Sequence, residues 1–234
     1  MPRCVAAPAS VPLLLVASAT LLLAASATVA QVPGPVVPDD PMEGLRLGES
    51  MWGHLEEYRE FRCDPSDAFP GITFCRKIRF ERDRHGSYNV MYSFLHTREG
   101  TLVYVDRYQR PAVLDAAAAA HIIDHISRAR GEPTRTSTMP QRPGLPDGIL
   151  AVWGKTELEP LSDARIALIA KGQVQATEFL VDFLVDAPRS AKEQLPIWRL
   201  SGGAGFVWVA GLDHPSRGFM RMTAVDASAI AKSR

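Results

Sequence analysis

Alternating apolar and polar residues govern how this chain can fold. In residues 73–81 and 87–96, apolar or aromatic side chains recur at every second position, as expected of strands with one buried face. A third apolar segment, 101–106, follows Gly100, which can take the positive φ of a short hairpin loop. We therefore expect three antiparallel strands joined by short loops.

The second half of the chain repeats this arrangement. Three apolar segments, 195–200, 205–212 and 218–225, are separated by the turn-forming sequences SGGA and DHPSR, which predicts a second meander. Residues 148–161 also read as strand, and 177–185 alternate in the same way.

Helices are predicted between the strands. One begins after Ser50 as N-cap, another covers 114–130 with Asp115 as cap and Gly131 as its end, and a third covers 162–172. Helices interspersed with hairpin-linked strands indicate an α+β fold of antiparallel meanders with a few short helices, and not a doubly wound parallel sheet.

The first thirty residues have the layout of a secretory signal peptide. Arg3 precedes an apolar run, and small residues allow processing after Ala27 or Ala30. The alternative is an uncleaved anchor, because the run is about as long as the ~20 residues of a spanning helix. Cleavage predicts a periplasmic or secreted protein with no stable membrane span.

The composition restricts the class of partner. The chain has 26 Lys and Arg and 26 Asp and Glu, so it lacks the basic excess of a dedicated nucleic-acid binder.

Proline-rich residues 31–42 predict an extended linker, followed by a domain at 43–226 and a tail at 227–234. The alternative is two small halves with a boundary near 133–147, where proline and polar residues predict a loop.

Cys63 and Cys75 are predicted to form a structural disulfide. Their spacing does not fit a redox CxxC motif, and an exported compartment is oxidising. A reactive thiol or a metal ligand is the alternative. The bond would hold the intervening loop rigid and exposed, which makes Asp64, Asp67, Phe69 and Gly71 candidate contact residues.

Residues 121–125, HIIDH, are the best candidate for a metal site. His121 and His125 stand one helical turn apart and could reach the same ion. The motif lacks the glutamate that a zinc peptidase uses as general base, and Arg128 would repel a cation. A solvated helix face is therefore the preferred interpretation, and we expect neither a metal nor another cofactor.

No set of residues in the sequence defines a catalytic centre. His96, Asp106 and Arg107 lie near the ends of predicted paired strands, but no spacing selects a triad. Residues 48–53, GESMWG, resemble a nucleophile elbow only superficially, since the second glycine comes one residue late. The charged run 76–85 reads as a solvated strand and turn, with a patch for anionic lipid or glycan as the alternative.

The sequence GLRLGESMWGHLEEY, within residues 43–60, resembles the opening of β-lactamase-inhibitor-like and outer-membrane small-lipoprotein domains. That resemblance implies a helix pair on a short antiparallel sheet. The later part of the chain departs from it, so no binding residues are carried over. As a whole the chain is similar to uncharacterised exported proteins of rhizobial-type alphaproteobacteria.

These observations predict an exported protein without catalytic activity that binds a protein or another component of the cell envelope. The first alternative is a small envelope hydrolase that uses His96, Asp106 or the pair His121 and His125. The second alternative is an inhibitor of a secreted enzyme.

Overall fold

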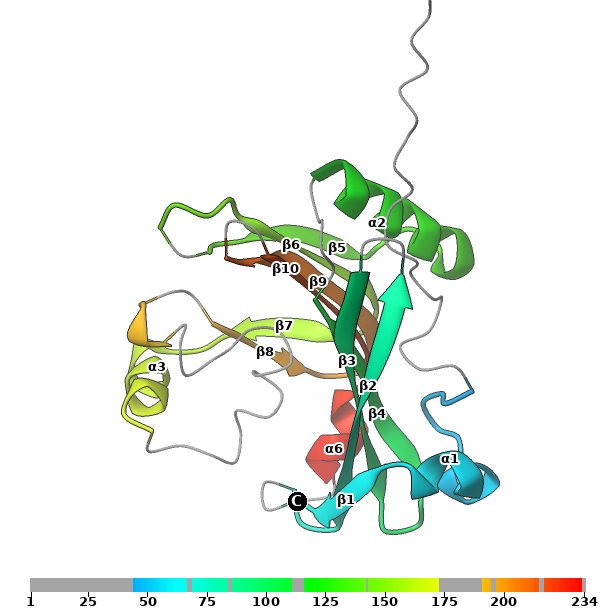
Figure 1. The fold of residues 1–234 in the computed structure, drawn as a ribbon. Helices are drawn as coiled ribbons and strands as arrows, with labels where there is room; N and C mark the ends of the chain where they lie inside the picture. The colour runs from blue at the N-terminus through cyan, green and yellow to red at the C-terminus, as the bar shows by residue number, and fades with distance from the viewer. Residues whose placement is uncertain are drawn as a thin grey trace, which may run out of the picture. The chain divides into compact units, whose positions relative to one another are not determined.

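The fold combines short helices with a large antiparallel sheet (Figure 1). The computed structural model describes residues 44–66, 69–83, 86–110, 116–141, 143–172, 191–194, 197–214 and 217–232. All of them belong to one compact unit, residues 34–234. The helices are η1 (Met51–Gly53), α1 (Leu55–Arg59), α2 (Ala116–Arg130), α3 (Asp163–Ala170) and α6 (Ala227–Lys232).

Eight strands form the main sheet, in the order β1-β2-β3-β4-β10-β9-β6-β5. Every pairing in it is antiparallel. The strands are β1 (Arg62–Pro65), β2 (Ile72–Asp83), β3 (Gly86–Thr97), β4 (Leu102–Gln109), β5 (Arg135–Met139), β6 (Gly148–Gly154), β9 (Ala204–His214) and β10 (Arg217–Asp226). Two further strands, β7 (Glu157–Pro160) and β8 (Trp198–Ser201), pair with each other. The α+β class with antiparallel meanders is therefore confirmed.

One face of the sheet, which we call the α2 face, is covered by α2 and the N-terminal segment. Ile122 and Ile126 of α2 pack on Trp208 and Met222. Beside them, Met51 and Phe61 pack on Phe94 and Val105 of the central strands. Each fully buried side chain of this size contributes about 1.5–3 kcal/mol to the free energy of unfolding.

The opposite face, the α6 face, is covered by α6 and the paired strands β7 and β8. Ile230 of α6 and Leu200 of β8 belong to the same buried cluster as Tyr104 and Val207. The sequence predicted only a tail at 227–234, yet Ala227 and Ile230 are buried. Both faces of the sheet centre are thus covered, which explains the nearly continuous apolar sequence of β9.

Some elements differ from those predicted. Residues 133–147, expected to be a loop, contain β5, and the sheet joins strands from both sides of this segment. Ser162 caps α3 as expected, by accepting a hydrogen bond from the backbone N–H of Arg165. The predicted cap Asp115 and the predicted strand 177–185 lie outside the described residues.

The β3–β4 hairpin depends on Gly100. This residue has φ +86°, the left-handed region in which L side chains are strained. A Cβ atom built on Gly100 would lie 2.5 Å from Nε1 of Trp52, whose ring covers the hairpin. Glycine is therefore required at this position for two independent reasons.

We predict that Gly100→Ala lowers the free energy of unfolding by about 2–4 kcal/mol, because backbone strain and displacement of the Trp52 ring add together. Gly131→Ala is the matched control, since Gly131 also has φ +78° but a Cβ there meets nothing within 4 Å. Its expected cost is about 1–2 kcal/mol. Urea denaturation of both variants measures the difference, and equal losses would contradict the packing of Trp52 on the hairpin.

Candidate functional site

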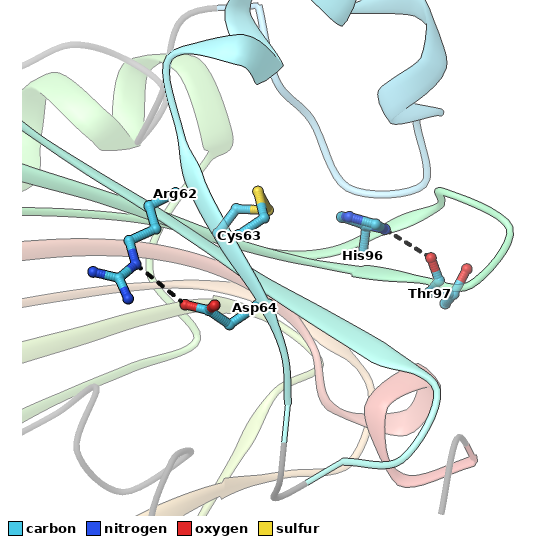
Figure 2. Close-up of a disulfide and its surroundings, with 6 residues drawn as sticks. Arg62, Cys63, Asp64, His96 and Thr97 are labelled. Atoms are coloured by element: carbon cyan, nitrogen blue, oxygen red, sulfur yellow. Dashed lines mark hydrogen bonds and ion pairs between the residues drawn. A yellow bond between two sulfur atoms is a disulfide. The ribbon is translucent and has the colours of Figure 1, made fainter.

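The disulfide Cys63–Cys75 joins two neighbouring strands, β1 and β2 (Figure 2). The two residues are directly opposite each other in the strand register, with Cα atoms 4.1 Å apart. Cys75 is fully buried, in the same apolar cluster as Phe61 and Phe94. The predicted disulfide is confirmed, and it links two neighbouring strands.

The loop inside the disulfide differs from the exposed contact surface that the sequence suggested. Phe69 is fully buried in the core of the α6 face, so its ring is not exposed for a partner. The backbone N–H of Phe69 donates to Oγ of Ser66, which follows β1 directly. Asp64 and Gly71 are exposed, and Asp67 lies outside the described residues. Asp64 lies 3.6 Å from Nε of Arg62.

Exposed apolar side chains point to a different surface. Among the described residues, the large hydrophobic side chains that remain exposed are Trp52, Leu55, Ile78, Phe80 and Leu168. Trp52 and Leu55, which are 52% and 50% exposed, lie three positions apart at the junction of η1 and α1. We call these two residues the N-terminal patch.

Trp52 is held in place although half of it is exposed. Its indole N–H donates to the carbonyl oxygen of Glu99 at 3.0 Å, which ties η1 to the β3–β4 hairpin. Its ring also lies 6.4 Å from that of Tyr58 and 6.2 Å from that of His96, measured between centroids. The exposed edge of Trp52 is therefore presented by a fixed side chain.

The sequence did not reveal the N-terminal patch because it predicted one continuous helix. In such a helix Met51 and Leu55 would share a buried side, one turn apart. The structure has a 3-10 turn capped by Ser50 instead, and His54 leaves helical geometry with φ −124° and ψ 38°. This break buries Met51 completely and turns Leu55 to the surface.

His96 and Asp106 lie on opposite faces of the sheet. The ring of His96 contacts Trp52, Tyr58 and Phe94 on the α2 face. Asp106 is opposite Ser93 and Thr223 in the register and belongs to the α6 face. The two side chains therefore do not meet in one site.

Asp106 instead forms a polar contact between β4 and β10. Its Oδ1 accepts a hydrogen bond from Oγ1 of Thr223 at 2.8 Å and lies 3.1 Å from Nε of Arg221. Complete burial raises the pKa of Asp106, and the charge of Arg221 only partly opposes this effect. A carboxylate enclosed in this way has a structural role in joining two strands.

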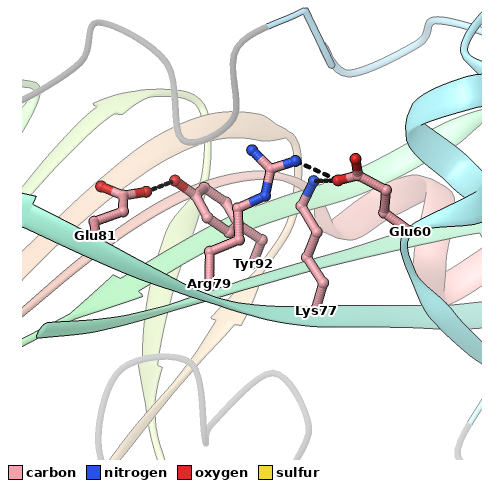
Figure 3. Close-up of polar contacts among 5 residues, drawn as sticks. All are labelled: Glu60, Lys77, Arg79, Glu81 and Tyr92. Carbon is pink, nitrogen blue, oxygen red and sulfur yellow. Dashed lines mark hydrogen bonds and ion pairs between the residues drawn. The ribbon is translucent and has the colours of Figure 1, made fainter.

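Arg107 lies on the α2 face, within a second polar network (Figure 3 shows its neighbours on β2 and β3). Its guanidinium donates to Glu81 at 2.9 Å, to the hydroxyl of Tyr92 at 2.9 Å and to Oε1 of Gln109 at 2.7 Å. Tyr92 in turn donates to Glu81. Burial, together with that hydrogen bond to Glu81, raises the pKa of Tyr92 to about 12. The phenol therefore keeps its proton at neutral pH and serves as a donor.

A third acid, Glu60, extends this network toward α1. It accepts from Nζ of Lys77 at 3.0 Å and from Arg79 of the same strand. The hydrogen bond from Lys77, followed by that from Arg79, lowers the pKa of Glu60. Lys77 also lies 4.4 Å from the centroid of the Phe61 ring. The charged run 76–85 thus contains side chains that bind within the molecule as well as solvated ones.

The histidines of α2 lie on the outer side of that helix. His121 and Asp124 are exposed, in agreement with the solvated helix face that the sequence predicted. Asp124 accepts a hydrogen bond from Arg128 at 3.2 Å. In the described part of the chain, no group of three His, Cys, Asp or Glu side chains could hold a metal ion. A metal at His121 and His125 would thus lack a third such ligand from these residues.

No family model matches this chain, and no curated protein or solved structure matches it. The resemblances expected from the sequence stay predictions. Within the residues that the structure describes, no helix is long and apolar enough to cross a membrane.

We predict that Cys63 and Cys75 resist thiol labelling in the native protein and react only after reduction. Reduction should lower the free energy of unfolding by about 3 kcal/mol, because the bond closes a short loop in the unfolded chain. Maleimide labelling followed by peptide mass spectrometry tests the pairing. Labelling of either residue in the native, unreduced protein would contradict it.

Proposed function

We propose that this chain is an exported, non-catalytic protein that binds another protein of the cell envelope through the N-terminal patch. The observation that carries the proposal is Trp52, half exposed yet fixed by the Glu99 carbonyl and the surrounding rings. Tryptophan is enriched among the residues that dominate the affinity of protein interfaces. A side chain that is already ordered loses little conformational entropy on binding.

The surroundings of the N-terminal patch indicate the kind of partner. Glu56 and Glu57 follow Leu55 in α1, and Glu99 lies at the hairpin beneath Trp52; all three are exposed. Arg59 lies 3.2 Å from Glu56, and Arg98 adjoins Glu99, so charges of both signs surround the apolar centre. Such a mixed rim favours a partner with complementary charges around an apolar pocket. A surface of this kind is a contact for a folded protein more than for a small molecule.

Export is supported by the signal-like sequence of residues 1–30 and by the disulfide, which suits an oxidising compartment. A non-catalytic role is supported by the separation of His96 from Asp106 on opposite faces of the sheet. The buried partners of Asp106 suit a structural carboxylate more than a general acid or base.

We predict that in-cell crosslinking of the tagged protein captures an envelope protein, and that Trp52→Ala and Leu55→Ala reduce the captured amount. Loss of a dominant interface residue costs about 2 kcal/mol or more, or roughly thirtyfold in affinity. Leu168→Ala is the matched control, because Leu168 is also exposed, at 37%, but belongs to α3.

Capture of the same partner in equal amounts by all four proteins would overturn the role of the N-terminal patch. Capture of no protein by the wild type would overturn the proposed function itself. Because Trp52 covers Gly100, circular dichroism must show that Trp52→Ala is folded; Leu55, whose side chain is half exposed, provides the second and less disruptive variant.

A further inference from the structure

β2 is an edge strand over most of its length. β1 pairs with it only from Thr73 to Arg76. From Lys77 to Asp83, β2 pairs with β3 on one side, and no strand in the described part of the chain pairs with its other side. Such an edge presents unpaired backbone N–H and C=O groups that can bind another strand.

This free edge is also apolar on the α6 face. Ile78 and Phe80 are 66% and 79% exposed, the highest values among the large hydrophobic side chains that the structure describes. Proteins commonly protect a free edge with charged residues. Here the charges of the α2 face are arranged by sign, since Lys77 and Arg79 precede Glu81. The positive residue Arg82 instead shares the α6 face with Phe80.

We infer that the free edge of β2 binds a second copy of this chain, with the two β2 strands antiparallel and Phe80 at the two-fold axis. In this register each Arg79 is directly opposite Glu81 of the second copy, on the α2 face. The two Phe80 rings meet on the α6 face. Opposite charges and aromatic pairs at directly opposed positions both stabilise antiparallel strands.

The charge pattern selects this register among those that a two-fold axis allows. Directly opposed residues of an antiparallel pair lie on the same face of the sheet. A two-fold axis perpendicular to the sheet therefore lies midway between two copies of the same residue, and the register is named by that residue. An axis at Arg79 would oppose two guanidinium groups, and an axis at Glu81 would oppose two carboxylates. An axis at Ile78 would oppose Lys77 and Arg79. Within the free stretch from Lys77 to Asp83, the axis at Phe80 opposes no like charges, and it lies at the middle of that stretch.

The side chains on the α2 face are already oriented for this contact. Figure 3 shows Glu81 held by Tyr92 and Arg79 held by Glu60. Arg107 also donates to Glu81. Glu81 keeps 28% of its side chain exposed and Arg79 keeps 53%. Both groups can therefore meet a second copy without leaving their own partners, and a self-complementary edge makes an isologous dimer.

Thiol crosslinking tests the register directly. In the purified protein, Phe80→Cys should form a disulfide-linked dimer under mild oxidation, since opposed Cβ atoms lie about 4.5–5.5 Å apart. Ile78→Cys is the matched control, because its two thiols would be separated by four residues, roughly 13 Å along the strands. No crosslink with Phe80→Cys, or equal crosslinking of both variants, would overturn the inference. A crosslink only in a mixture of the two variants would place the axis at Arg79 and contradict the proposed register.

Sedimentation velocity tests the dimer without introduced thiols. The wild type should form a dimer, and Arg79→Glu should weaken it at least about tenfold, since it opposes like charges at two positions. Arg82→Glu makes the same charge change but lies opposite Ile78, so it should leave the dimer in place. A monomeric wild type would overturn the inference, even if its free edge bound an extended peptide from another protein. Neither result depends on the N-terminal patch, so the proposed function is tested separately.

Discussion

The pairing of β4 with β10 holds the two halves of this protein together. Asp106 and Thr223, which are 117 positions apart in sequence, form a fully buried hydrogen bond across it. Without this pairing, the meander β1–β4 and the strands β5, β6, β9 and β10 would each expose another edge. The cluster beneath α6 contains residues of β4, β9 and β10, so the packing of this helix depends on the joined sheet. α2 packs on β6, β9 and β10.

The sheet also determines which side chains can work together. Successive residues of a strand point to opposite faces, so neighbours in sequence such as Asp106 and Arg107 enter separate networks. Asp106 contacts β10 on the α6 face, whereas Arg107 contacts β2 and β3 on the α2 face. Polar residues that look like a catalytic group in the sequence are thereby distributed among structural contacts. The groups that remain available for a partner are therefore on the surface, where Trp52 and the free edge of β2 are exposed.

Local sequence patterns predicted much of the fold. Alternation located β2 and β3, apolar segments bounded by turn residues located β9 and β10, and capping residues located α3, because those signals depend on neighbours in sequence. β1 and β5 were missed, since both are edge strands that need little apolar surface; Met139 is the only buried residue of β5. The order of the strands in the sheet could not be predicted from local patterns either, because it follows from packing between distant segments.

The candidate surfaces depended on details that periodicity does not contain. Leu55 faces solvent because of a single break at His54, and Phe69 is buried although it lies inside the disulfide loop. The free edge of β2 appears only once the length of β1 is known. In each case the deciding quantity was a backbone conformation or a pairing length. The cysteines were the exception, because an oxidising compartment and their spacing sufficed.

Amide hydrogen exchange of the native protein tests most directly whether the two halves form one cooperative sheet. Protected amides of β3 and β4 should open with the same free energy as those of β9 and β10, close to that of global unfolding. Opening of the β2–β4 amides at a free energy well below that of β9 and β10 would show that the halves unfold separately. Such a result would contradict the β4–β10 pairing as the contact that holds the protein together.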